Sequence, residues 1–247
     1  MALHQFSVCI ANLEPSSCLV RPFNTKITKL VIFILYTNIL GTVMIPDANV
    51  YSDDELRSIL TTARDEYEVQ TKDKSPSILT ENLGVENFWE AEEKMLKLIS
   101  AHISENGGFK NRELLENIVL WKFAPAVGNI RDLSTDRVYE ESERAFTANT
   151  ASEAMSVLSE LDGIAASMAG AVLTFANPDR YTVMDPRATT ALTSLGYWNS
   201  PCEASVDLYE TYCLRSHQLS QQTDLPLRAV DRALYIINDD GAQDYLK

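Results

Sequence analysis

Asp185 is the residue whose type and position point most directly to chemistry. It follows the apolar run 181–184 and stands immediately before Pro186. A carboxylate held at the floor of a cleft can stabilise positive charge that develops on a substrate. An aspartate before a proline also caps a helix, because its side chain accepts a hydrogen bond from an unpaired amide of the first turn. The sequence leaves both roles open, and one side chain can fill both.

Trp121 and Lys122 are the next residues that could do chemistry, and they stand near the end of a helix predicted over 112–123. Lys122 ends the apolar stripe of that helix, where burial would make its amine nucleophilic. The Trp121 indole could stack on a flat ring. A plainer interpretation is that Lys122 interacts with the negative end of the helix dipole while Trp121 contributes to packing.

Residues 158–188 hold the most informative pattern. A helix is expected to end at Leu161, the chain turns through Asp162 and Gly163, and a helix rich in alanine and glycine begins near Ala165. Glycine permits the positive backbone angle that such a turn requires. The first amides of the new helix have no partners within it, so they form a cradle suited to one phosphate group.

The segment Leu-Asp-Gly-Ile-Ala at 161–165, the small-residue helix after it and the link 178–185 resemble the helix-hairpin-helix DNA glycosylase superfamily. The signature of that superfamily is a Leu-Pro-Gly-Val-Gly hairpin, a small-residue helix and a short link that ends in aspartate. The resemblance covers about forty residues. It implies an all-α, two-lobed fold with a cleft between the lobes, and excision of a damaged or modified base from DNA.

The resemblance also implies roles for individual residues. Asp185 would stabilise the oxocarbenium-like sugar or activate the attacking nucleophile, and Trp121 would stack on the extruded base. Lys122 would supply an amine if one attacks the sugar. The residues expected to contact DNA are Gly163, Ile164, Ala165, Ser167 and Arg187. Arg187 could instead pair with Asp185 or be a solvated arginine at the start of a helix.

Three positions depart from the superfamily pattern. Ser167 stands where bifunctional members carry a lysine, so Schiff-base chemistry from that position is not expected. Ala165 replaces the second glycine of the hairpin. Asp162 replaces the proline and places negative charge where a phosphate would dock. The alternative function is therefore a catalytically inactive helix-hairpin-helix module that binds DNA or a protein partner.

The composition limits the possible partners. The chain carries a formal net charge of −14, which excludes binding to phosphate through a broad basic face, so any nucleic-acid site must be local. Three histidines and cysteines without a CxxC pair predict neither zinc ligation nor an iron–sulfur cluster. We therefore expect a reduced, cytoplasmic protein without metal or cofactor. The sequence leaves the oligomeric state open.

Residues 1–43 differ from the rest of the chain. They hold three basic residues against Glu14, a charge of +2, which leaves −16 from Met44 onward. The apolar stretch 30–44 could anchor in a membrane, although it is short for a spanning helix and fits a secretory signal poorly. The remaining interpretation is that Met44 is the natural start. We exclude this leader from the fold and assign 44–247 to one helical domain.

From Met44 onward the pattern predicts successive helices without strand-like alternation. Ser52 and Glu55 form the signature of a capping box at the start of the first helix. Arg228, Asp231 and Arg232 either line the cleft or form an exposed charged face. The predicted helices span about 52–69, 86–105, 112–123, 133–148, 152–161, 165–176, 186–195, 204–219 and 226–238.

Overall fold

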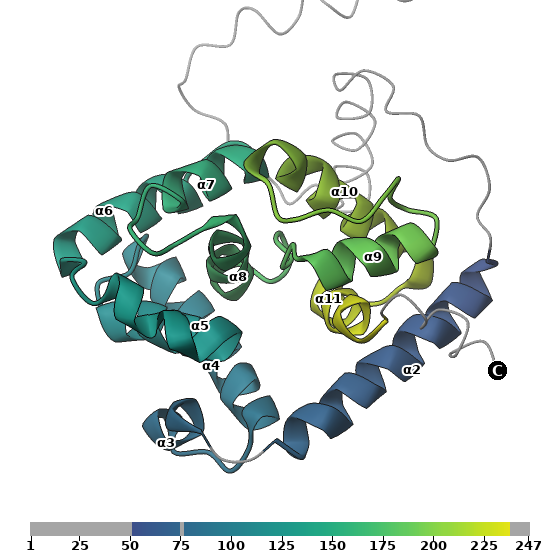
Figure 1. Cartoon of the computed structure of the whole chain (residues 1–247), viewed down its shortest axis with the longest axis horizontal. Coiled ribbons are helices and arrows are strands. Elements are labelled where there is room, and N and C mark those ends of the chain that lie inside the picture. Colours follow the sequence, from purple (N-terminus) through teal and green to yellow (C-terminus); the bar gives the residue numbers. More distant parts are fainter. Residues whose placement is uncertain (1–50, 75–76, 238–247) are drawn as a thin grey trace, which may run out of the picture. The chain divides into compact units, whose positions relative to one another are not determined.

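The computed structural model describes residues 51–74 and 77–237, and all regular secondary structure within them is helical (Figure 1). The predicted all-α class is therefore confirmed for this part of the chain. The prediction of a leader over residues 1–43 lies outside the described residues. Among the helices that are described, none combines the length and the apolar character needed to cross a membrane.

The helices follow one another through short connections. In chain order they are α2 (Asp53–Lys72), α3 (Ile78–Leu83), α4 (Phe88–Asn106), α5 (Arg112–Phe123), the 3-10 helix η1 (Ala124–Ile130), α6 (Thr135–Phe146), α7 (Ala151–Leu158), α8 (Ala166–Ala176), α9 (Pro186–Ser194), α10 (Val206–Thr223) and α11 (Leu227–Ile236).

Several helix starts are determined locally by capping side chains. Ser52 and Glu55 form the predicted capping box at α2, in which the Ser52 hydroxyl and the Glu55 carboxylate each accept an amide hydrogen bond. Asn87, Ser134 and Thr150 cap α4, α6 and α7 in the same way with their side-chain oxygens. Such caps satisfy amides that the helix itself leaves unpaired.

One set of helices surrounds α8, which packs against α4, α5 and α7. Every residue of α8 from 168 to 176 is buried, and small side chains at Ala169, Gly170 and Ala171 permit this close packing. A Cβ added at Gly170 would lie 3.3 Å from the Met155 side chain in α7. The small-residue helix is thus the centre of this set.

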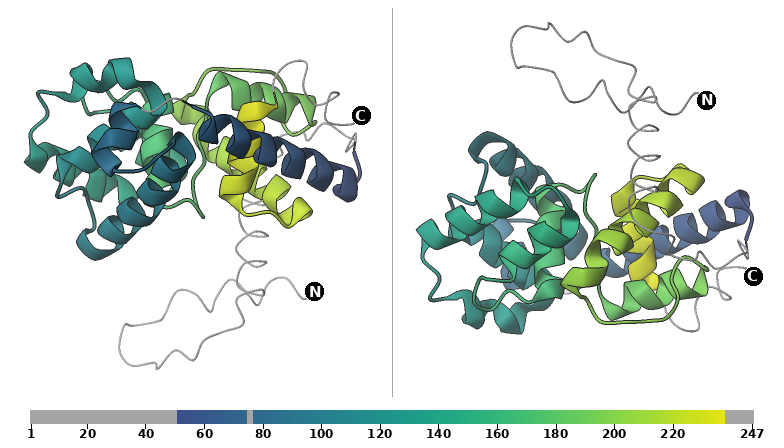
Figure 2. Two further views of the ribbon diagram at one scale, coloured as in Figure 1. Left: turned by 90° about the horizontal axis from the view of Figure 1, so that it is seen from below. Right: turned by 90° about the horizontal axis from the view of Figure 1, so that it is seen from above.

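A second set of helices gathers on α11. The helices α2, α9 and α10 all pack against α11, and Figures 1 and 2 show α2 running beside it although the two are far apart in sequence. The link between α8 and α9 connects the two sets. The link and the facing surfaces of α5 and α11 position the candidate site.

Candidate functional site

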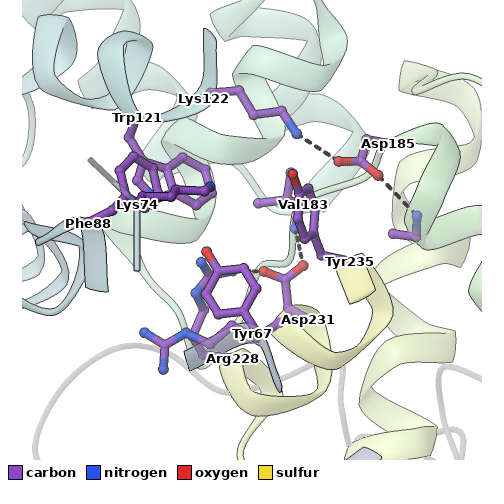
Figure 3. Close-up of a pocket in the computed structure, with 12 residues that line it drawn as sticks. Tyr67, Lys74, Phe88, Trp121, Lys122, Val183, Asp185, Arg228, Asp231 and Tyr235 are labelled. Atoms are coloured by element: carbon purple, nitrogen blue, oxygen red, sulfur yellow. Dashed lines mark hydrogen bonds and ion pairs between the residues drawn. The ribbon is translucent and has the colours of Figure 1, made fainter. Parts of the chain in front are cut away.

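Asp185, Lys122 and Trp121 line one pocket, which has a volume of about 140 Å³ (Figure 3). Its walls come from α5, from the link before α9 and from α11, with α2 and the start of α4 contributing further side chains. Trp121 and Lys122 are neighbours in the sequence, Asp185 follows Lys122 by 63 residues, and the fold brings all three to one pocket. None of the residues expected to contact DNA, which lie in the hairpin and at Arg187, lines this pocket.

The link that carries Asp185 is held in place by buried tyrosines of α10. The Tyr209 hydroxyl donates to the Thr182 carbonyl at 2.9 Å, and the Tyr212 hydroxyl donates to the Val183 carbonyl at 3.0 Å. Both tyrosines are fully buried, and burial raises the pKa of each well above its ordinary value. They act as neutral donors that fix the backbone just before Asp185.

Asp185 has two separate partners, one for each carboxylate oxygen. Its Oδ1 accepts a hydrogen bond from the Ala188 amide at 3.0 Å, which confirms that the residue is the N-cap of α9. Its Oδ2 accepts from the Lys122 ammonium at 2.8 Å. The capping bond orients the carboxylate so that the second oxygen faces the wall formed by α5.

Lys122 reaches this position from the last turn of α5. It pairs with Asp185 across 63 residues of sequence, and the side chains of the two are 18% and 13% exposed. The interpretation that Lys122 interacts only with the dipole of its own helix is therefore incomplete, because Asp185 is its ion-pair partner. An amine and a carboxylate in contact at a pocket wall can exchange a proton, and together they can activate a nucleophile or stabilise a developing cation.

The interpretation of Arg187 as a partner of Asp185 is wrong. Arg187 is exposed, and its guanidinium lies 4.9 Å from the centre of the Tyr235 ring. Residues two positions apart on a helix point to different sides, so Arg187 cannot follow the Asp185 carboxylate toward Lys122.

Trp121 forms an aromatic wall of the pocket. Its ring lies nearly parallel to that of Phe88, with centroids 6.4 Å apart and an angle of 15° between the planes. The buried ring of Phe175 in α8 lies nearly perpendicular to the Trp121 ring, and the centroids of the two rings are 4.9 Å apart. The Trp121 Nε1 donates to Glu92 at 3.1 Å, so its orientation is fixed by both packing and hydrogen bonding.

Glu92 is a fully buried carboxylate that the sequence analysis did not select. Its Oε2 accepts from the Tyr67 hydroxyl at 2.5 Å and from Trp121, and its Oε1 accepts from Arg228 and Arg232, each at 2.7 Å. All four donors line the pocket. Burial would raise the pKa of Glu92, but the charges of Arg228 and Arg232 and the hydrogen bonds from Tyr67 and Arg228 lower it to about 2.

The sequence did contain a signal for Glu92. It precedes Met95 by three positions and Ile99 by seven, and both of these are fully buried residues of α4. A residue with that spacing lies on the same helix face, so an acidic residue there must be buried and needs cationic partners.

Asp231, in α11, is a second buried carboxylate at the site. Its Oδ1 accepts from the Thr182 hydroxyl at 2.6 Å and from the Val183 amide at 2.9 Å, while Oδ2 pairs with Arg228. The sequence left open whether Arg228, Asp231 and Arg232 line a cleft or form an exposed face. All three line the pocket, and each is largely buried.

The hairpin lies apart from the pocket. Gly163 has φ +84°, and a Cβ there would come within 2.9 Å of the Asn129 backbone in η1. Ile164 is buried. Ala165 is the N-cap of α8, but its side chain cannot accept a hydrogen bond, so the amides of the first turn, including that of Ser167, have no side-chain cap. Asp162 is exposed and pairs with Arg137 at 3.2 Å.

Within residues 51–74 and 77–237, no group of three histidine, cysteine, aspartate or glutamate side chains is arranged to hold a metal ion. Comparison of the chain with protein-family models, with curated proteins and with solved structures finds no match. The function must therefore be argued from the site.

Proposed function

We propose that this protein is a DNA N-glycosylase that excises a damaged or modified base, with Asp185 and Lys122 as its catalytic residues. The observation that carries the proposal is the contact of 2.8 Å between the Lys122 Nζ and the Asp185 Oδ2 at the wall of a pocket flanked by Trp121. An aromatic wall can hold an extruded base, and a carboxylate beside it can stabilise charge on the sugar.

The arrangement of the helices supports this proposal. In the proposed two-lobed glycosylase fold, the helices around α8 form one lobe and those around α11 form the other. Lys122 belongs to the first set, and Asp185 begins α9 in the second, so their ion pair bridges the two. The hairpin turn at Gly163 leads into α8, whose first amides have no side-chain cap and can donate hydrogen bonds to a phosphate of the DNA backbone.

The proposed reaction breaks the bond between C1′ of the sugar and the base nitrogen. The base leaves with the electron pair of that bond and takes up a proton from solvent water. Positive charge then develops on the sugar, where the Asp185 carboxylate stabilises it. The nucleophile that adds to C1′ is water or the Lys122 amine, and in either case Asp185 is placed to accept the proton that the nucleophile loses.

The test uses the full chain and duplexes that contain uracil, 8-oxoguanine or an alkylated purine. We expect abasic product from the native protein and none from Asp185→Asn. Asparagine is as good an N-cap as aspartate, so this variant removes the charge while keeping the cap of α9. An unchanged yield from Asp185→Asn would refute the catalytic role of the carboxylate.

Borohydride trapping identifies the nucleophile. If the Lys122 amine attacks, a covalent protein–DNA adduct forms with the native chain and disappears in Lys122→Gln. If water attacks, abasic product forms without an adduct. The Ser167→Ala variant is the control, because Ser167 occupies the lysine position of the bifunctional enzymes and does not line the pocket.

A second function is favoured by the hairpin itself. The Asp162 side chain is 78% exposed in the turn, where its charge opposes a DNA phosphate. This observation supports an inactive module that binds DNA weakly or binds a protein partner. Salt-sensitive DNA binding without any abasic product would establish the module, and Asp162→Asn would then strengthen the binding.

A further inference from the structure

We propose that the pocket accepts a flat ring bearing carbonyl oxygens, either neutral or negatively charged, and rejects a cationic ring. The consequence for catalysis rests on the proposed glycosylase function and names its substrate class: bases with carbonyl groups, such as uracil or oxidised guanine, in preference to cationic alkylated bases. The binding preference itself is a property of the pocket and is testable without catalysis.

The first argument is that cations of the protein already lie over the aromatic rings of the pocket. The Tyr67 ring has the Arg232 guanidinium 6.0 Å from its centre. Three further cations lie closer to the centre of a ring: Lys74 at 4.4 Å from Phe88, Arg228 at 5.4 Å from Trp121 and Arg187 at 4.9 Å from Tyr235. A cation within about 6 Å of the centre of an aromatic ring is attracted to the negative face of that ring. A cationic guest would therefore meet like charge from Lys74, Arg228 and Arg232, the three of these cations that line the pocket.

The second argument is that the carboxylates of the pocket are already engaged. Asp231 accepts from Thr182, from the Val183 amide and from Arg228. Asp185 accepts from the Ala188 amide and from Lys122. Each carboxylate already has a protein cation as its counter-ion, so neither is an unpaired anion that would favour the binding of a cationic ring.

The third argument is that the pocket offers spare donors. An ammonium group has three N–H bonds, and among the described residues Asp185 is the one acceptor bonded to the Lys122 ammonium. Its other two N–H bonds are available to a guest at a side chain that is 18% exposed. Carbonyl oxygens are the complementary acceptors, whereas a ring nitrogen carrying positive charge offers none.

The test compares three purine deoxynucleosides chosen to separate the effect of a carbonyl group from the effect of a positive charge. Deoxyinosine is neutral with a carbonyl, deoxyadenosine is neutral without one, and 1-methyldeoxyadenosine is cationic without one. We expect isothermal titration of the full 247-residue chain to show deoxyinosine binding about tenfold more tightly than deoxyadenosine, as one hydrogen bond to a charged donor provides. The cationic nucleoside should bind most weakly.

Two variants assign the preference to named groups. Lys122→Met should remove the advantage of deoxyinosine over deoxyadenosine, because it removes the spare donors. Lys74→Ala should strengthen binding of 1-methyldeoxyadenosine, because it uncovers the Phe88 ring. Thermal unfolding of both variants checks that the fold is retained.

The inference is overturned if the cationic nucleoside binds as tightly as deoxyinosine, or if no nucleoside binds at millimolar concentration. The expected order of affinities without base excision would refute the proposed enzyme while leaving the pocket assignment intact. If the protein excises a base but binds the cationic nucleoside more tightly than deoxyinosine, the inference about the pocket is refuted while the proposed enzyme is not.

Discussion

Replacing Glu92 by glutamine tests the buried network on which the pocket depends. The carboxylate is fully buried and binds Tyr67, Trp121, Arg228 and Arg232. Glutamine has nearly the same shape but lacks the charge, and its amide nitrogen is a donor where an acceptor is required. The variant therefore removes the buried carboxylate that Arg228 and Arg232 share and leaves each guanidinium with a single acidic partner, Asp231 and Glu93 respectively.

The expected loss follows from the pKa of Glu92. Lowering that pKa from 4.5 to about 2 corresponds to a contribution of about 3 kcal/mol to the free energy of unfolding at neutral pH. Breaking a buried ion pair by removing one partner costs about 3–5 kcal/mol, which agrees. We expect Glu92→Gln to lose about 3 kcal/mol in urea unfolding followed by circular dichroism at pH 7.

The pH dependence provides a second check. Because the pKa of Glu92 is lower in the folded protein, its stabilisation is complete above about pH 4.5 and declines as the pH falls toward about 2. The stability difference between native protein and variant should shrink over that interval. A difference that stays constant from pH 7 down to pH 3 would contradict the assignment.

Glu93→Gln is the matched control on the same helix. Its side chain is 36% exposed and pairs with Arg232, and because this carboxylate remains accessible to solvent we expect the pair to contribute about 1 kcal/mol. If Glu92→Gln costs no more than Glu93→Gln, the reasoning about the buried network is refuted.

Three further substitutions test the elements that position the site. Asp185→Ala should be about 1 kcal/mol less stable than Asp185→Asn, because both variants lose the ion pair with Lys122 but only alanine also loses the cap; equal losses in chemical denaturation would contradict the cap. Gly163→Ala should cost more than 1 kcal/mol, because φ is +84° and the added Cβ would clash with η1. Gly128→Ala is its control, since nothing lies within 4 Å of an added Cβ there. Thr182→Val should cost about 1–3 kcal/mol by removing a buried donor to Asp231, and a neutral effect on the thermal midpoint would show that this bond is dispensable.

The start of α2 and the cap of α9 were predictable because they depend on neighbouring residues. Ser52 and Glu55 satisfy each other's amides within one turn, and Asp185 caps the helix that Pro186 begins. The segments Ile78–Leu83 and Ala124–Ile130 were not predicted as helices. The first is too short to show a periodic pattern, and the second is a 3-10 helix with proline in its first turn.

The sequence by itself determined the helical class, the ends of several helices and which side chains were suited to chemistry. Tertiary structure decided which of them meet. Arg187 is two residues from Asp185 but does not contact its carboxylate, whereas Lys122 is 63 residues away and does. Glu92 joins donors 25 to 140 residues distant. Local capping depends on a single turn, but an ion pair between helices depends on which faces pack together, and only the assembled core fixes that.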